Sequence, residues 1–255
     1  MLVLGIGDII GKPGRQAVKR LLPKLRQEHG LDLVVANGEN AAGGIGLTIS
    51  TAEELFEAGV DVITSGNHIW LHREIIPYLD SERPVLRPLN YPPGVPGKGY
   101  LIMGQTMVVN VIGRTFMSEI DCPFQAMNKL LAQVENKPPI IIVDFHAEAT
   151  SEKAAMGRYL DGRVSAVLGT HTHVGTIDSQ VLPRGTAYVT DIGMTGPINS
   201  IIGDDTQQVL QRFLTRLPHR LSVGSGKTAF TAILVNIDDA SGRAISIERI
   251  YHEVE

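Results

Sequence analysis

The sequence predicts an α/β protein in which two mixed sheets pack together and helices cover their outer faces. Apolar runs of strand length alternate with stretches whose apolar residues recur at helical spacing. Strands separated by helices in this way are typical of βαβ units and of a parallel sheet. Two pairs of apolar runs with short connections, in the middle of the chain and at its C-terminal end, look instead like antiparallel hairpins.

The first third of the chain shows the alternation most clearly. A helix is expected over residues 15–29, in which Pro23 predicts a kink or an early break. Another helix is expected from about Thr51, because Thr51 and Glu54 have the spacing of a capping box. The strands expected in this part are residues 2–6, 32–36 and 61–64.

The remainder adds strands of both kinds. Residues 91–99 and 192–203 are rich in glycine or proline and are expected to be loops. Helices are expected over residues 126–134, 151–160 and 206–217. The expected strands are residues 100–103, 107–111, 140–143, 164–168, 185–190, 230–237 and 244–251.

Composition limits the function classes. With 255 residues and no linker-like stretch, one compact domain over residues 1–255 is expected. The net charge of −4 gives no reason to expect tight binding to duplex nucleic acid. Cys122 is the single cysteine, which excludes an intrachain disulfide and a cysteine-rich metal site. There is no signal-peptide pattern and no apolar run long enough to span a bilayer, so we expect a cytoplasmic protein without a membrane partner.

Polar residues that can bind metal ions follow five of the expected buried strands. Open α/β sheets place ligand sites beyond the carboxyl ends of their strands, so residues scattered in sequence can meet there. Imidazole together with carboxylate and amide oxygen suits Mn²⁺, Fe or Zn²⁺ better than an all-oxygen Ca²⁺ site. The candidates are Asp8, Glu39, Asn40, Asn67, His68, His146, His171 and His173.

The arrangement suggests a dinuclear centre. Two metal ions about 3.5–4 Å apart need a shared ligand, and Glu39 is the natural bridging carboxylate. On extended backbone His171 and His173 would point the same way. Each motif alone could be a turn or a helix cap, but four of the eight histidines lie at strand ends beside the acidic and amide candidates. The other four, at positions 29, 72, 219 and 252, are expected to be solvated.

Two nucleotide-binding motifs are excluded. The stretch from Gly224 to Thr228 resembles the end of a P-loop, but Leu221 stands where the first glycine is required and a strand-like run follows. The glycines at positions 5, 7 and 11 are one residue too widely spaced for a dinucleotide fingerprint, and Asp8 would repel a pyrophosphate.

The motifs, in their order along the chain, resemble those of the calcineurin-like metallophosphoesterases. They are Gly7-Asp8, Gly38-Glu39-Asn40, Gly66-Asn67-His68 and Gly169-Thr170-His171-Thr172-His173. Six longer stretches are similar to the YmdB family of bacterial metallophosphoesterases. These are GDIIGKPGR, NGENAAGGIG, SGNHIW, DFHAEATSEK, DGRVSAVLGTHTHV and TDIGMTGP. This resemblance implies a four-layer α/β/β/α sandwich, a dinuclear centre and phosphodiesterase activity on 2′,3′-cyclic nucleotides. It departs from the wider superfamily at Ile10, where a histidine is usual, and at Glu39, where aspartate is usual.

The resemblance also implies roles for the candidates. His68 would protonate the departing ribose oxygen, Glu148 and Asp178 would orient ligand imidazoles, and the loop of residues 193–196 would form a wall of the substrate site. Two divalent ions per chain are implied, with Fe or Mn favoured and Zn or Mg as alternatives. One ion would take Asp8, Glu39, Asn40 and His173, and the other would take Glu39, Asn67, His146 and His171.

Other functions stay open from the sequence. A metal-dependent phosphomonoesterase or nucleotidase would use the same centre, and a regulator that binds a nucleotide or RNA without turnover is a third class. The expected partner is a small phosphate ester or cyclic nucleotide. RNA ends and a homo-oligomeric assembly are further alternatives.

Overall fold

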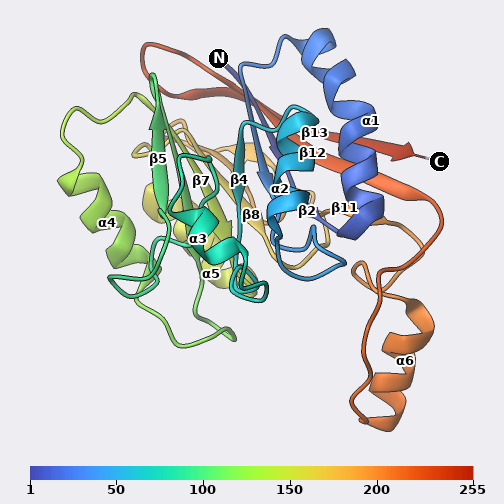
Figure 1. Cartoon of the computed structure of the whole chain (residues 1–255). Helices are drawn as coiled ribbons and strands as arrows, with labels where there is room; N and C mark the ends of the chain where they lie inside the picture. Colours follow the sequence, from blue (N-terminus) through green and yellow to red (C-terminus); the bar gives the residue numbers. More distant parts are fainter. Residues whose placement is uncertain (255) are drawn as a thin grey trace.

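Two mixed β-sheets lie face to face in the computed structural model, which describes residues 1–254 (Figure 1). In the first sheet the order is β2-β11-β12-β1-β3-β4, and β13 also pairs with β12. Strands β1, β3 and β4 run parallel, whereas β12 is antiparallel to β1. The members are β1 (Leu2–Ile6), β2 (Asp8–Ile9), β3 (Leu33–Asn37), β4 (Val62–Thr64), β11 (Met194–Pro197), β12 (Thr228–Ile237) and β13 (Ala244–Val254).

The second sheet has the order β5-β6-β7-β8-β10-β9. Its centre is parallel, because β6, β7, β8 and β10 run the same way, and β5 and β9 are antiparallel edges. The members are β5 (Tyr100–Met103), β6 (Thr106–Ile112), β7 (Ile140–His146), β8 (Ala166–Thr170), β9 (Gln180–Val181) and β10 (Ala187–Val189).

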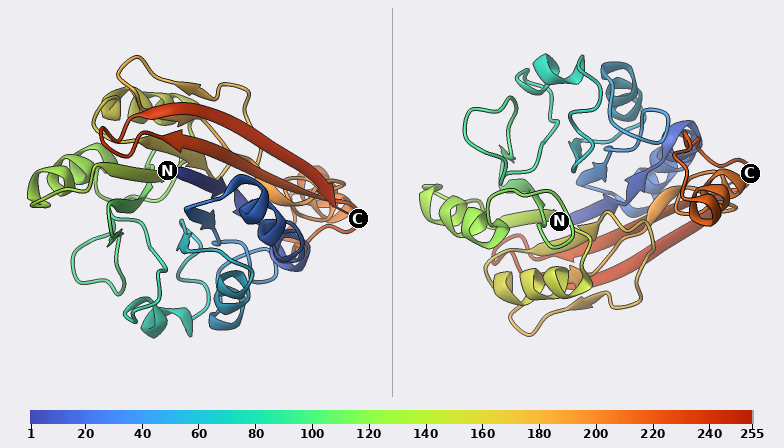
Figure 2. Two further views of the ribbon diagram at one scale, coloured as in Figure 1. Left: turned by 90° about the horizontal axis from the view of Figure 1, so that it is seen from above. Right: turned by 90° about the horizontal axis from the view of Figure 1, so that it is seen from below.

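Helices cover the outer faces of both sheets (Figure 2). Three separate apolar clusters fill the three spaces between layers. One joins the first sheet to α1 and α2, one lies between the sheets, and one joins the second sheet to α4 and α5. The helices are α1 (Gly11–His29), α2 (Ile49–Glu57), α3 (Ile75–Leu79), α4 (Pro123–Gln133), α5 (Thr150–Leu160) and α6 (Thr206–Thr215). The expected four-layer α/β/β/α sandwich is therefore confirmed.

Three local expectations were wrong. Helix α1 begins at Gly11 instead of residue 15 and continues past Pro23 to His29, so the early break predicted as one alternative at Pro23 does not occur. The capping box of α2 is made by Thr48 and Thr51, not by Thr51 and Glu54. Residues 192–203 are not all loop, since Met194–Pro197 forms β11, whose Met194 pairs with Asp8 in the parallel strand β2. Among the residues described, no helix is both long and apolar enough to cross a lipid bilayer.

Candidate metal centre

The structure brings all eight candidate residues to one edge of the two packed sheets. Parallel strands β1, β3 and β4 of the first sheet and β7 and β8 of the second end there, and the candidates follow or terminate these strands. This topology is the one that the sequence-based expectation assumed, in which residues far apart in the sequence lie together at the carboxyl ends of parallel strands. Those candidates are Asp8, Glu39, Asn40, Asn67, His68, His146, His171 and His173.

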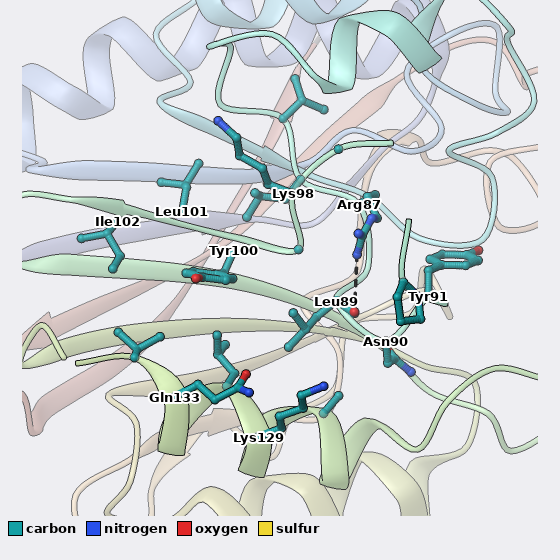
Figure 3. Close-up of a pocket in the computed structure, with 18 of the residues that line it drawn as sticks. Arg87, Leu89, Asn90, Tyr91, Lys98, Tyr100, Leu101, Ile102, Lys129 and Gln133 are labelled. Atoms are coloured by element: carbon teal, nitrogen blue, oxygen red, sulfur yellow. Dashed lines mark hydrogen bonds between the residues drawn. The ribbon is translucent and has the colours of Figure 1, made fainter. Parts of the chain in front are cut away.

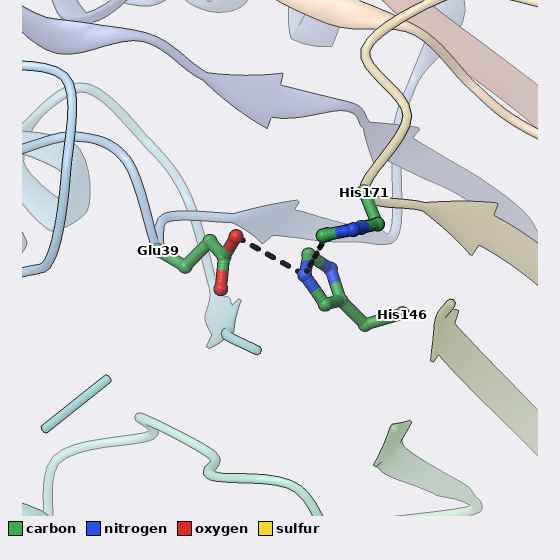
Figure 4. A group of neighbouring side chains, drawn as sticks. All are labelled: Glu39, His146 and His171. Atoms are coloured by element: carbon green, nitrogen blue, oxygen red, sulfur yellow. Dashed lines mark hydrogen bonds and ion pairs between the residues drawn. The ribbon is translucent and has the colours of Figure 1, made fainter. Parts of the chain in front are cut away.

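One group of ligand atoms surrounds His146. Its Nε2 atom lies 3.1 Å from Glu39 Oε1, 3.2 Å from Asn67 Oδ1 and 3.0 Å from His171 Nδ1. Figure 4 shows Glu39 and the two imidazoles converging from different elements. Glu39 and His146 are fully buried. Four atoms that can each donate a lone pair thus meet in a space shielded from water, which is the arrangement a cation ligand set requires.

A second group lies beside the first and shares Glu39. His173 Nε2 lies 3.8 Å from Asp8 Oδ1 and 3.1 Å from Asn40 Nδ2, and that amide nitrogen is 3.3 Å from Glu39 Oε1. Asp8 is fully buried, and its Oδ1 atom has no hydrogen-bond partner. A buried carboxylate oxygen without a partner is costly unless a cation or another donor satisfies it.

Hydrogen bonds outside the cluster fix which nitrogen of each imidazole faces inward. The Thr170 hydroxyl donates to Asp144 (2.7 Å) and therefore accepts from His146 Nδ1 (2.9 Å), which leaves His146 Nε2 as the nitrogen that faces Glu39 and would give up its proton to a cation. His171 Nε2 lies 3.0 Å from the Glu148 carboxylate. His173 Nδ1 donates to the Ile202 carbonyl at 2.7 Å. Each imidazole thus has one nitrogen anchored outside the cluster and the other directed into it, as metal-ligating histidines do.

The charges in this buried space shift the pKa values strongly. Burial raises the pKa of Asp8 to about 6, although His173 and His146 act against it. Burial would also raise the pKa of Glu39, but the neighbouring His146 outweighs it and holds that pKa well below its usual range. Burial opposes charge on His146, yet Glu39, Asp8 and Asp144 together raise its pKa to about 9. A protonated His146 is thus the counter-charge of these carboxylates when no cation is bound.

His171 behaves in the opposite way. Burial and the adjacent His146 lower its pKa to about 3, so its imidazole is neutral at physiological pH. A neutral imidazole whose far nitrogen is anchored by Glu148 is ready to act as a ligand.

The positions of His171 and His173 in space agree with the sequence-based prediction, but their backbone does not. The stretch after β8 is not extended, because His171 has a φ of 100° and His173 has a φ of 67°. Such left-handed conformations are uncommon for residues other than glycine. Both imidazoles still face the cluster, and the His171 N–H donates to Asp8 at 3.1 Å.

Gly66 is a contributor that the sequence did not identify as part of the site. A Cβ atom at this position would lie 2.2 Å from His146 Nε2 and 2.4 Å from Glu39 Oε2. Only the absence of a side chain lets the turn after β4 approach both residues. The glycine directly before Asn67 was a visible signal, since a glycine at a strand end often marks close approach of the backbone.

His68 lies at the edge of the cluster rather than among its innermost atoms. Its Nδ1 atom is 2.9 Å from Asn40 Oδ1, and its backbone N–H donates to Glu39 Oε2 at 3.2 Å. The side chain is partly exposed, with 31% of its surface accessible. His68 therefore lies between the buried cluster and the protein surface.

Several subsidiary predictions had mixed outcomes. Glu148 does contact His171, but Asp178 hydrogen-bonds Thr176 and Thr190 and not an imidazole, so its predicted role was wrong. Residues 194–196, which were predicted to form part of a substrate-site wall, belong to strand β11, and Gly196 of this strand lies against Ile10. His29 and His252 are exposed as expected, whereas His72 and His219 are half-buried.

A separate cavity of 1490 Å³ lies between α4, β5 and the segment 82–99 (Figure 3). None of the eight candidates lines it. Arg87 enters this cavity, and its Nη1 atom donates to the backbone carbonyls of Pro88 and Leu89. The candidate metal centre is therefore distinct from this cavity.

The fold and the cluster of Glu39, His146 and His171 define a two-sheet α/β protein with a metal-capable centre. The chain belongs to the YmdB-like protein family, whose model matches residues 4–250. It is 47% identical to the 2′,3′-cyclic-nucleotide 2′-phosphodiesterase of Bacillus subtilis, over 98% of this chain and 96% of that protein.

Two solved structures have the same fold over nearly the whole chain. A hypothetical protein from Thermus thermophilus superimposes with a TM-score of 0.93 at 48% identity, covering 99% of both chains. A protein described as a novel phosphatase from Mycoplasma pneumoniae also gives a TM-score of 0.93, at 31% identity, covering 99% of this chain and 93% of that one.

Proposed function

We propose that this protein is a metal-dependent phosphodiesterase that hydrolyses 2′,3′-cyclic nucleotides at a centre of two divalent cations. The observation that supports this most strongly is the convergence of four lone-pair donors on one buried point beside His146 Nε2. The cyclic-nucleotide phosphodiesterase of Bacillus subtilis, at 47% identity over 98% of this chain, supports the substrate class.

Each cation has its own set of residues in this proposal. One set is Asp8, Glu39, Asn40 and His173, and the other is Glu39, Asn67, His146 and His171. The donor atoms fit this assignment, because Asp8 Oδ1 is buried without a hydrogen-bond partner and each ligand imidazole is anchored through one nitrogen and turns the other into the cluster. Asn40 directs its Nδ2 atom toward His173, so a half-turn of the amide is needed to bring its oxygen to the cation.

The cations supply a Lewis acid for the phosphoryl oxygens and lower the pKa of a bound water toward about 7. The chain supplies geometry and a proton. Glu39 holds the two ligand sets together, and Asp8, Glu148 and Thr170 fix the loop and imidazoles around them. His68 donates a proton to the departing ribose oxygen, a contribution of about 10²–10⁴ in rate.

The ligand types suit Fe or Mn best, with Zn or Mg as alternatives. Imidazole ligands favour transition metals, whereas the shared carboxylate accepts either kind of ion. Because the proposed substrate group is a cyclic phosphate on ribose, RNA ends that carry this group belong to the same substrate class.

A phosphomonoesterase is the second candidate, and the Mycoplasma pneumoniae structure described as a phosphatase favours it. Protein stripped of metal and reloaded with Mn²⁺ distinguishes the two in assays with 2′,3′-cyclic AMP, a nitrophenyl diester and a nitrophenyl monoester. We expect turnover of both diesters to exceed that of the monoester. Preferential monoester hydrolysis would favour the phosphatase, and no hydrolysis by loaded protein would contradict both.

A further inference from the structure

The cavity that Arg87 enters is a groove along one edge of the second sheet. All four residues of strand β5 line it, together with helix α4 and the segment 82–99 (Figure 3). Strand β5 is an edge strand, and its last residue, Met103, lies opposite Thr106 at the start of β6. We call this cavity the β5 groove.

One end of the β5 groove lies at the sheet edge that carries the metal centre. Asn90 lines the groove, and its side chain accepts from the Ile112 N–H at 3.0 Å and donates to the Ile112 carbonyl at 2.8 Å. Ile112 lies opposite His146 of the neighbouring strand β7. Because Thr106 and Ile112 are the two ends of β6, the groove runs for about 20 Å away from the metal centre.

An aromatic pair joins this end of the groove to His68. Tyr91 lines the groove, and its ring meets that of Trp70 edge to face, with 5.3 Å between the ring centroids. Trp70 lies in the turn that follows His68, where the Leu71 N–H donates to the His68 carbonyl at 3.1 Å. Rings on which nucleobases can stack therefore lie between His68 and the groove.

The groove carries basic side chains in a chain whose net charge is −4. Arg87 and Lys98 come from the segment 82–99, and Lys129 comes from α4 (Figure 3). The acidic residues of the lining are all exposed; they are Glu82, Asp121 and Glu135. A local concentration of positive charge of this kind attracts an anionic chain even when the whole protein is acidic.

Arg87 is the half-buried cation of the groove. Its Nη1 atom donates to the carbonyls of Pro88 at 2.8 Å and Leu89 at 3.4 Å. Within residues 1–254 no carboxylate lies within 4 Å of its guanidinium, and no acceptor is hydrogen-bonded to Nη2. Burial lowers the pKa of Arg87, although the charge of Asp80 acts against it. A partly desolvated guanidinium with unused donors suits the paired oxygens of a phosphate.

We propose that the β5 groove binds single-stranded RNA that leads into the metal centre, so that the substrate is an RNA strand ending in a 2′,3′-cyclic phosphate. This inference rests on the proposed function and extends its substrate from a nucleotide to a strand. The terminal cyclic phosphate lies at the cations, the last bases stack against Trp70 and Tyr91, and the preceding phosphates lie along Arg87, Lys98 and Lys129. A basic groove with aromatic rings holds single-stranded nucleic acid without reading its sequence.

An acidic peptide paired with the free edge of β5 is the competing occupant. Such a peptide would use the basic side chains, but it would leave unused both the aromatic pair and the closeness of the groove to a phosphodiester centre. The observations at Trp70, Tyr91 and Asn90 therefore favour RNA.

Fluorescence anisotropy with Mn²⁺-loaded protein and 5′-labelled hexauridylate tests the groove. This probe ends in a 3′-hydroxyl, so the proposed activity does not consume it. For three phosphate contacts, a plot of log affinity against log salt concentration should have a slope of about −2. Lys98→Gln/Lys129→Gln should weaken binding about 10-fold or more and bring the slope to about −0.7.

Lys19→Gln/Lys24→Gln is the matched control. Both lysines are exposed on α1, which covers the other sheet, and the change in net charge is the same. This variant should bind hexauridylate as the wild type does. Circular dichroism and thermal unfolding establish that both double variants are folded.

Turnover supplies the second readout. In wild-type protein kcat/KM should be about 10-fold or more higher for hexauridylate ending in a 2′,3′-cyclic phosphate than for 2′,3′-cyclic UMP, and Lys98→Gln/Lys129→Gln should lower this ratio toward one. Hydrolysis of cyclic UMP without a gain for the strand, or equal RNA binding by wild type and the groove variant, overturns this inference and leaves the proposed function intact. Binding of hexaglutamate in place of hexauridylate also overturns it. Absence of hydrolysis of either substrate contradicts the proposed function, and the substrate assigned here falls with it.

Discussion

The ammonium nitrogen of Lys153 lies 2.6 Å from Asp191 Oδ2, and both side chains are buried. The same carboxylate oxygen accepts from the Thr172 N–H at 3.1 Å and from its hydroxyl at 2.8 Å. Lys153 also donates to the Thr170 carbonyl at 2.6 Å. The ion pair therefore holds the backbone on both sides of His171, where the chain has its unusual left-handed conformation.

Asp191→Asn should weaken metal binding, because the amide cannot balance the Lys153 charge or accept as strongly from Thr172. Residues that orient metal ligands typically contribute about 10–100-fold to metal affinity. Competition with a chelator for Mn²⁺ measures this loss. Asp161→Asn is the control, since Asp161 is also buried and accepts from the backbone of Arg184 and Thr186. Equal affinity losses in both variants would show that the effect is general destabilisation.

Gly66→Ala should abolish or greatly weaken metal binding. Its new Cβ would lie within 2.4 Å of both His146 Nε2 and Glu39 Oε2. Gly5→Ala provides the comparison, because there the Cβ meets the Leu168 side chain between the sheets and not the metal centre. Both variants should melt at lower temperature, but Gly5→Ala should keep its metal affinity. Metal binding by folded Gly66→Ala at the wild-type level would contradict the geometry described here.

His68→Ala should reduce turnover of 2′,3′-cyclic AMP by about 10²-fold or more, and hydrolysis of a nitrophenyl diester much less. A ribose alkoxide needs a proton in order to leave, whereas nitrophenolate does not. Metal content and melting temperature should stay at the wild-type values. If both substrates lose activity equally in a metal-replete, stable variant, His68 binds the phosphate and does not protonate the leaving group.

Metal-free protein should lose stability as the pH rises from about 6.5 to about 9. The pKa of His146 is raised to about 9 in the folded state, against 6.5 for ordinary histidine. The protonated imidazole thus stabilises the fold fully below pH 6.5, and this contribution is lost as the pH rises through 9. Thermal unfolding of chelator-treated protein at several pH values measures the change.

The variant His146→Gln has no proton to lose in this range, so its melting temperature should change less between pH 6.5 and 9. Bound metal should also remove the dependence, because the cation replaces the proton on His146. A pH dependence that is identical in wild-type and His146→Gln protein would assign it to other groups.

The convergence of the candidate residues was predictable because the strands that carry them are recognisable from local sequence. Apolar runs such as residues 140–143, within β7, mark buried parallel strands, and the carboxyl ends of such strands meet at one edge of a sheet. Asp8 and His171 are 163 residues apart in sequence, yet this rule alone places them close together.

Other features depend on tertiary contacts that leave no periodic pattern. Strand β11 contains Gly196, and its partner β2 has two residues, so neither is distinguishable from loop by its sequence. The burial of Lys153 could not be predicted from the sequence either, since a lysine in a helix is normally solvated. Its burial follows from Asp191, which is 38 residues away.

Glu39 is the residue on which the dinuclear proposal depends, because it lies in both ligand sets. Glu39→Gln should weaken both cation sites together, since a neutral amide cannot bridge two cations as a carboxylate does. Asp8→Asn should weaken chiefly one site. Titration with Mn²⁺ measures the number and affinity of the sites in each variant.

The most direct measurement is the number of metal ions in wild-type protein, counted by elemental analysis and located by anomalous scattering. The proposed centre predicts two ions per chain, one beside His146 and His171 and the other beside Asp8 and His173, with activity lost on chelation and restored on reloading. A fully active protein with one ion or none at full occupancy would contradict the dinuclear centre.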